Sequence, residues 1–182
     1  MSKVLTKVFL SSIFLFSVLT SCDSTKKTTD KKASDNGHLI GKITIRDIET
    51  SEHNSWFSKE LVNYQVDTET LDDFENNPER LKKLSVKIFM ATWCEDSHRE
   101  LPRFYNIMRF LNITDYEIFA MDYHKETPEK YEKGLTVKYV PTFIIYSEGK
   151  ELNRIIESPV ESLEKDLIAI VQAKNYTPNY QD

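Results

Sequence analysis

The chain has 182 residues, of which 40% are hydrophobic, and a net charge of −5 at pH 7. This acidic balance argues against nucleic acid as a partner, because such partners are bound by an excess of Lys and Arg. The four glycines form no Gly-rich phosphate loop, and the four histidines lack the spacing of metal ligands. We therefore expect no metal and no cofactor.

Residues 1–21 have the pattern of a secretory signal peptide. Lys3 and Lys7 are followed by an apolar run over residues 8–19, which is shorter than the ~20 helical residues that span a bilayer. The small residues before Cys22 resemble a bacterial lipobox, so we expect cleavage there and lipid modification of Cys22. Acyl chains on Cys22 would anchor the protein in the bacterial cell envelope, facing the periplasm. The alternative is that a cysteine lies beside the cleavage site by coincidence.

Composition divides the rest of the chain into three segments. Residues 22–38 are rich in Ser, Thr, Lys and Asp without apolar periodicity. They cannot bury enough surface to offset chain entropy and should form a flexible tether. Residues 39–175 have the apolar patterns of one globular domain. Residues 176–182 show no pattern and are expected to form a loose tail.

The domain alternates between helical and strand patterns. The expected elements, in chain order, are a half-buried strand from Ile40 that includes Ile43 and Ile45, a helix over Trp56–Tyr64 with Ser55 as N-cap, a helix over Thr68–Leu84 broken near Pro78, a strand over Val86–Met90, a helix over Glu95–Leu111, a strand over Tyr116–Met121, a hairpin of Thr142–Tyr146 and Glu151–Glu157, and a helix over Val160–Ala173. This order predicts an α/β fold with a mixed sheet flanked by helices. The sheet should be parallel where helical crossovers join strands and antiparallel at the hairpin.

Cys94 stands at the junction between the strand expected over Val86–Met90 and the helix expected over Glu95–Leu111. A helix N-terminus offers unpaired N–H groups and a partial positive charge, which favour a thiolate. If Cys22 carries lipid, Cys94 is the only free thiol and no internal disulfide can form. An unpaired thiol in an oxidising compartment is either buried and inert or kept for its reactivity, and this position favours reactivity.

Three features together resemble the thioredoxin family. The run Phe89–Cys94 is similar to its active-site strand, and Pro102 stands where a proline kinks its active-site helix. The dipeptide Val140-Pro141 is similar to its cis-proline loop. The resemblance spans about Ile40–Ala173 and extends to a bacterial lipoprotein subgroup with the motif Thr-Trp-Cys-x-Asp-Ser. It implies a thioredoxin-like fold.

The resemblance also implies a site. Cys94 would be the nucleophile of thiol–disulfide exchange, and Trp93, Val140 and Pro141 would form the substrate-binding surface. A cis bond before Pro141 would turn the Val140 backbone outward, where a bound peptide could pair with it as an extra strand. The alternative is an ordinary trans proline that begins a strand.

Ser97 departs from the family, which has a second cysteine at this position. A mixed disulfide on Cys94 could then not be released by internal attack and would need an external thiol. Ser97 could donate a hydrogen bond to the thiolate, or it could bond to the backbone of the first helical turn. Glu95 and Asp96 could oppose the thiolate by their charge, or they could serve as favourable charges in that turn.

Other positions near the thiol carry weaker signals. Thioredoxins bury an acidic residue on the strand that leads to the thiol, but this chain has Ile88 there, so that proton relay is expected to be missing. His98 is expected on the solvated surface. Asp122, Tyr123 and His124 follow an expected strand, and they either shape a substrate groove or cap a loop.

The leading hypothesis is a membrane-anchored monothiol protein that performs thiol–disulfide exchange through Cys94. Its partners would be oxidised or thiol-bearing proteins or small thiols, and it would act as a thiol–disulfide oxidoreductase if the thiol is activated. Two alternatives stay open. The fold could be a binding module in which Cys94 is a partly buried small side chain, or Cys94 could be a redox sensor that is oxidised to sulfenic acid.

Overall fold

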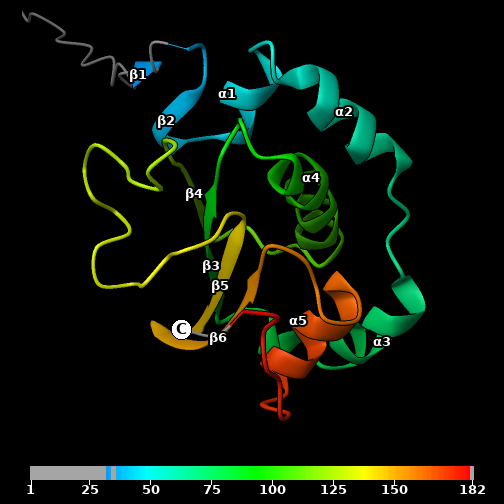
Figure 1. The fold of residues 1–182 in the computed structure, drawn as a ribbon. Coiled ribbons are helices and arrows are strands. Elements are labelled where there is room, and N and C mark those ends of the chain that lie inside the picture. The colour runs from blue at the N-terminus through cyan, green and yellow to red at the C-terminus, as the bar shows by residue number, and fades with distance from the viewer. Residues whose placement is uncertain (1–31, 34–35, 181–182) are drawn as a thin grey trace, which may run out of the picture.

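The computed structural model describes residues 32–33 and 36–180 (Figure 1). The predicted signal peptide over residues 1–21 and the predicted lipidation site Cys22 lie outside these residues. In the described ranges, each helix is too short or too polar to cross a membrane. The strands are β1 (Lys32–Ala33), β2 (Leu39–Ile43), β3 (Leu84–Met90), β4 (Tyr116–Ala120), β5 (Thr142–Ser147) and β6 (Lys150–Ile156). The helices are α1 (Ile45–Glu49), α2 (Asn54–Asn63), α3 (Thr68–Asn76), α4 (Glu95–Phe110) and α5 (Leu163–Val171), with a 3-10 turn over Pro78–Arg80.

The strands form one mixed sheet in the order β1-β2-β4-β3-β5-β6. β3 and β4 run parallel, with Met90 opposite Ala120, and the other neighbouring pairs are antiparallel. β3 lies in the interior of the sheet, and its last three residues, Ile88, Phe89 and Met90, are apolar and all buried. The predicted α/β fold with a mixed sheet flanked by helices is confirmed.

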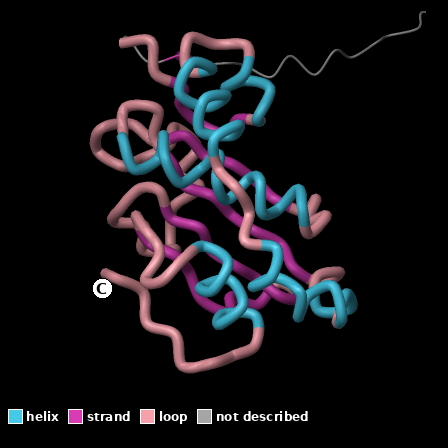
Figure 2. Tube along the Cα trace, turned by 90° about the vertical axis from the view of Figure 1, so that its right-hand side faces the viewer, coloured by secondary structure: helices cyan, strands magenta, loops and turns pink. Residues whose placement is uncertain are grey.

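The two faces of the sheet are covered differently (Figure 1, Figure 2). On one side, which we call the helix face, all five α-helices of the described chain place buried side chains in one core. Its members include Val86, Ile88, Met90, Phe104 and Phe143. On the other side, the loop face, the segment over residues 121–141 lies against the sheet. Its core consists of Phe89, Ala91, Phe119, Met121, Val140 and Ile144.

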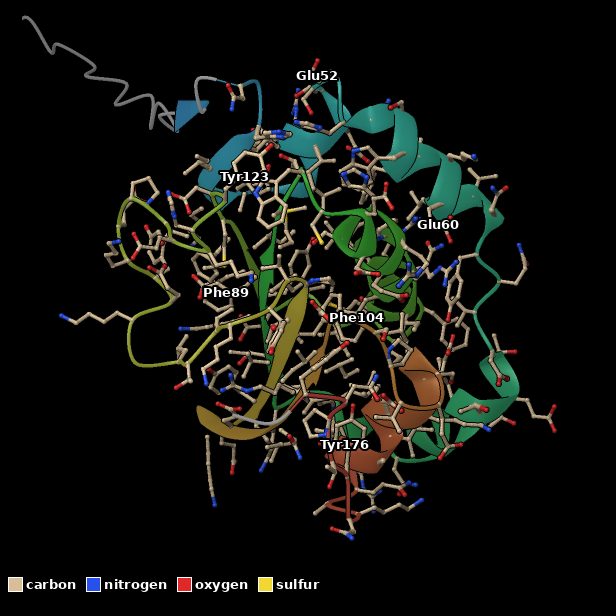
Figure 3. The ribbon with its side chains drawn as sticks, viewed as in Figure 1. Glu52, Glu60, Phe89, Phe104, Tyr123 and Tyr176 are labelled. Carbon is tan, nitrogen blue, oxygen red and sulfur yellow. The ribbon has the colours of Figure 1, made fainter. Side chains whose placement is uncertain are left out.

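The alternation of side chains along β3 divides the strand between these cores. Ile88 and Met90 point to the helix face, and Phe89 between them points to the loop face. Figure 3 shows Phe89 and Phe104 on opposite sides of the sheet. The residues at the end of β3 therefore contribute to both cores. The chain then turns after Met90 and begins α4 at Glu95.

The chain around Ile45 differs from the prediction. β2 ends at Ile43, and Ile45 is the first residue of α1 rather than part of the strand. The reason is a capping box, which favours a helix start over an extended chain. The Thr44 hydroxyl accepts a hydrogen bond from the Asp47 N–H, and the Asp47 carboxylate accepts one from the Thr44 N–H.

Two helix boundaries also differ. Ser55 lies inside α2, whose N-cap residue is His53, so the prediction of Ser55 as N-cap is wrong. The helix predicted over Thr68–Leu84 is interrupted as expected at Pro78, but it does not resume. Pro78 opens a single 3-10 turn, because proline lacks the N–H that would continue α3.

The C-terminal segment is attached to the domain. The Tyr176 hydroxyl donates a hydrogen bond to Asp166 at 2.9 Å, and its carbonyl accepts one from the Asn153 side chain at 3.1 Å. Further along, the ring of Tyr180 stacks on Tyr139 with centroids 4.8 Å apart. The prediction of a loose tail is therefore wrong for residues 176–180. The pattern search missed it because single polar and aromatic contacts leave no periodicity.

Candidate active site

Cys94 is the N-cap residue of α4 and has extended backbone angles, with φ −99° and ψ 121°. Its N–H donates to the Ala91 carbonyl at 3.1 Å, which closes the turn after β3. Its carbonyl accepts the first helical hydrogen bond, from the His98 N–H at 3.0 Å. The thiol is free and half-buried. This local geometry places the sulfur at the helix N-terminus, where the sequence predicted it.

The thiol meets the loop before β5. Cys94 Sγ lies 3.1 Å from the carbonyl oxygen of Val140, to which it donates a hydrogen bond. The Val140–Pro141 peptide bond is cis, and both residues are buried. A carbonyl only accepts, so this contact belongs to the protonated thiol and is lost when the sulfur is ionised. The fold therefore brings together three predicted site residues, Cys94, Val140 and Pro141.

Trp93 is held beside the thiol by two contacts. Its indole N–H donates to the Met121 carbonyl at 3.1 Å, and its ring stacks on Tyr123 with centroids 4.9 Å apart and 19° between the planes. Tyr123 is 58% exposed, so the stacked pair forms part of the surface. Trp93 also contacts the loop-face core, as Cys94 does. The predicted site residue Trp93 therefore packs against the same core as Cys94 and is held at the surface by Met121 and Tyr123.

A pocket of about 260 Å³ opens beside Trp93. It is lined by Asn36, His38, Ile40, Trp93, Asp122, Tyr123 and His124. The Asp122 carboxylate also accepts hydrogen bonds from the N–H groups of His124, at 2.8 Å, and Glu126, at 3.0 Å. Residues 122–124 therefore cap a loop and line this pocket, and their role in binding a substrate stays a prediction.

Ser97 is fully buried, with 0% of its surface exposed. Its hydroxyl oxygen accepts a hydrogen bond from the Ala91 N–H at 3.2 Å. Of the two roles considered for Ser97, the structure shows the bond to backbone, which ties the first turn of α4 to the end of β3. A hydrogen bond from Ser97 to an ionised Cys94 stays a prediction.

The carboxylates beside the sulfur differ in their partners. Asp96 accepts a hydrogen bond from the Arg99 guanidinium at 2.6 Å, whereas Glu95 is exposed. Arg99 also contacts Glu100 at 2.6 Å. Burial raises the pKa of Glu100, against the opposing effect of Arg99 and Arg103. The charge of Asp96 is thus balanced by Arg99, which limits its opposition to a thiolate at Cys94.

His98 is not on the solvated surface, and that prediction is wrong. Its ring is half-buried and stacks on Trp56 with centroids 4.3 Å apart and 15° between the planes. Its Nε2 lies 2.8 Å from the Thr92 carbonyl oxygen. Because that oxygen can only accept, Nε2 carries the proton.

His38, predicted to lie in the tether, belongs to the site. Its Nδ1 lies 3.2 Å from the Thr92 hydroxyl oxygen, and its Nε2 lies 2.9 Å from the Tyr123 hydroxyl. Thr92 also accepts a hydrogen bond from the Leu39 N–H at 3.2 Å. The sequence offered a signal for Thr92, which belongs to the Thr-Trp-Cys motif, but none for a contact across 54 positions. The ring of His53 lies 5.9 Å from that of His38, yet no described group of three His, Cys, Asp or Glu could hold a metal.

Ile88 lies in the helix-face core and is fully buried. The strand leading to Cys94 therefore has an aliphatic side chain where thioredoxins bury an acid. Cys94 has no carboxylate beneath it from this position of β3.

Comparisons with known proteins agree with this geometry. A family model described as "Thioredoxin" matches residues 47–169, more than half of the chain. Thioredoxin H2 from Arabidopsis thaliana is 31% identical over 90 residues, which cover 50% of this chain and 65% of that relative. The chain thus matches just under two thirds of that relative's length.

Two solved structures are similar at low identity. The X-ray structure of Fasciola hepatica thioredoxin is 20% identical with a TM-score of 0.38, over 58% of this chain and 93% of that one. A mutant thioredoxin from Halobacterium salinarum is 20% identical with a TM-score of 0.35, over 53% of this chain and 79% of that one. The match of the family model, together with a strand-to-helix cysteine against a cis-proline loop, decides the assignment. The chain belongs to the thioredoxin family.

Proposed function

We propose that this protein performs thiol–disulfide exchange through the single thiol of Cys94. The observation that carries the proposal is the position of the sulfur: it lies at the N-terminus of α4, is half-buried, and donates a hydrogen bond to the Val140 carbonyl. Membership of the thioredoxin family supports the same chemistry. Trp93, Val140 and Pro141 would form the surface against which a partner's disulfide lies.

The reaction needs two exchanges. The Cys94 thiolate attacks one sulfur of a partner's disulfide, a new S–S bond forms, and the partner's other sulfur leaves as a thiolate. Ser97 has no sulfur and cannot resolve this mixed disulfide. A second thiol, from the same partner or from a small molecule, then attacks and releases Cys94 as a thiolate. If the second thiol belongs to the same partner, the net result is rearrangement of its disulfides without oxidation or reduction.

The same proposal includes a location. Cleavage after residue 21 and lipid modification of Cys22 would hold the domain at the surface of a bacterial membrane, in the periplasm. Residues between Cys22 and β1 would act as a tether. Support comes from the sequence pattern, including the match to the Trp-Cys-x-Asp-Ser motif of bacterial lipoproteins. A Cys22→Ala variant expressed in bacteria should move from the membrane fraction to the soluble fraction, and wild-type protein found free of lipid would contradict the location.

The chemistry is tested on the full chain carrying Cys22→Ala, so that Cys94 is the only cysteine. Reaction with dithiobis(nitrobenzoate) should release one equivalent of coloured thiolate and leave a mixed disulfide on Cys94. Adding Cys94→Ala should abolish it. Ser97→Cys should add a resolving thiol and increase insulin reduction in the presence of dithiothreitol. Failure of the folded protein to react at Cys94 would overturn the proposal.

One observation favours a second candidate, a binding module. The Cys94 S–H already donates to the Val140 carbonyl, so the protonated thiol is satisfied where it lies. A thiol that reacts no faster than free cysteine, together with retained binding of a peptide in Cys94→Ala, would support that candidate.

A further inference from the structure

We infer that His98 is a positioning residue that holds the turn from Thr92 to Cys94 in the orientation that presents the thiol. This inference rests on the thiol chemistry proposed above. Among the described residues, the Cys94 sulfur forms no hydrogen bond with the His98 side chain. His98 therefore acts on the thiol through the backbone, and Trp56 holds the His98 ring in place.

One residue binds both ends of the turn. The His98 backbone N–H donates to the Cys94 carbonyl at 3.0 Å, and its side-chain Nε2–H donates to the Thr92 carbonyl at 2.8 Å. Trp93 lies between these two carbonyls in the chain. The peptide plane before Trp93 and the peptide plane after Cys94 are therefore both bound by His98, which restricts the directions of the Trp93 ring and the Cys94 sulfur between them.

The direction of the imidazole is itself fixed. The Trp56 ring stacks on it at 4.3 Å, and Trp56 comes from α2, which is anchored along α4 by independent contacts. The Asn106 side chain donates to the Leu61 carbonyl at 2.7 Å, and Arg103 pairs with Glu60 (labelled in Figure 3). A rigid α2 keeps the imidazole plane in place, so Nε2–H stays aimed at Thr92.

The Thr92 side chain is held from the opposite side. The Leu39 N–H donates to its hydroxyl, and His38 contacts the same oxygen. Thr92 is thus bound on its carbonyl by His98 and on its hydroxyl by the start of β2. A turn held on both sides has little freedom to rotate its peptide planes, which is the condition for a preoriented nucleophile.

The test compares side chains that differ in their reach to the Thr92 carbonyl. In the full chain with Cys22→Ala, the variants are His98→Gln, His98→Asn and His98→Leu. Glutamine can place an N–H near the position of Nε2, asparagine is too short to do so, and leucine has no donor. The readout is the second-order rate of mixed-disulfide formation between Cys94 and dithiobis(nitrobenzoate), measured beside urea unfolding of each variant.

Loss of one hydrogen bond that orients the nucleophile should slow the reaction by about threefold to tenfold in His98→Leu and His98→Asn. His98→Gln should stay within about twofold of wild type. If His98→Leu does not fold, the comparison of Gln with Asn decides, because both are polar amides. Equal rates for all folded variants, or faster rates without the donor, would overturn the inference.

The stacking of His98 on Trp56 is checked by the fluorescence of Trp56 in the folded protein, which a general loss of stability does not change. In a Trp93→Phe background, Trp56 is the only tryptophan, and its fluorescence should change when His98 is replaced. An unchanged emission spectrum would contradict the stack. Wild-type Cys94 that does not react at all would instead overturn the proposed function, so the two failures are distinguishable.

Discussion

The helix face and the loop face of the same sheet are built on different principles. The helix face is covered by the five α-helices of the described chain. Their buried side chains pack together with those of the strands in one core. The loop face has a much smaller core, covered by the segment over residues 121–141. Trp93 and Cys94 contact only the smaller core. The comparison teaches that the larger hydrophobic core lies on the helix face, whereas the side chains of Trp93 and Cys94 pack against the loop face.

The loop face is held by individual polar and aromatic contacts instead of a helix. Arg154 on β6 donates to the Leu135 carbonyl at 2.7 Å, while its other nitrogens pair with Glu151. The Tyr131 ring packs on Phe119 with centroids 4.6 Å apart. Each such contact can be removed without opening the helix face.

The largest effect is expected from the helix face. Phe104 on α4 is fully buried against Phe143 on β5, with centroids 4.4 Å apart. Phe104→Ala should lower the free energy of unfolding by about 3–5 kcal/mol, because it leaves a cavity that the surrounding helices cannot fill. Urea unfolding measures it. Phe110→Ala is the matched control on the same helix, since Phe110 is 40% exposed. A similar loss in both variants would contradict the contrast between buried and exposed positions.

The accuracy of the sequence-based prediction differs between the two faces, because the interactions that form them differ. The helix face rests on periodic apolar residues, and the helix over Glu95–Leu111 was predicted to within one residue of α4. The central strand was predicted from its short apolar run, and the hairpin from the glycine turn between its two strands. Errors arose where a local polar contact decides the structure, as at the capping box of Thr44, which converts Ile45 from strand to helix.

The candidate site was predictable only in part. Cys94 stood out by its position between a strand and a helix. Val140 and Pro141 were placed by resemblance, since no periodicity links them to a cysteine 46 positions earlier. His38 and His98 were misplaced because their roles depend on single hydrogen bonds to Thr92, which a linear pattern does not reveal.

A smaller effect is expected from the loop face. Arg154→Leu removes the hydrogen bond to the Leu135 carbonyl and should lower the free energy of unfolding by about 1–2 kcal/mol, because the acceptor is left without its charged donor. Trypsin should then cut the segment over residues 121–141 faster than in wild type. Glu151→Gln is the matched control, since it weakens the ion pair but keeps the bond to Leu135. If both variants are cut at the wild-type rate, side-chain contacts from β6 do not hold the loop face.

The smallest effect is expected from Glu100 on the helix face, and it tests whether its buried carboxylate lowers the free energy of unfolding. Glu100 is 3% exposed, and its Oε2 has no hydrogen-bond partner among the residues that the structure describes. Burial raises its pKa in the folded state above its ordinary value of 4.5. A raised folded pKa contributes stability below the unfolded pKa, and that contribution is lost as the pH rises through the folded pKa. The stability of wild type relative to Glu100→Gln should therefore fall as the pH is raised from about 4 through the folded pKa.

Urea unfolding of both proteins across this pH range measures the difference, with Glu95→Gln, at an exposed position of the same helix, as the matched control. The sign is informative because two influences compete at Glu100: burial raises the pKa, whereas Arg99 and Arg103 lower it. A difference that falls with pH means that burial wins and that the helix face carries one unfavourable charge at neutral pH. A difference that rises means that the two arginines win, and the network from Asp96 to Arg103 then stabilises the first turns of α4 on which Cys94 depends.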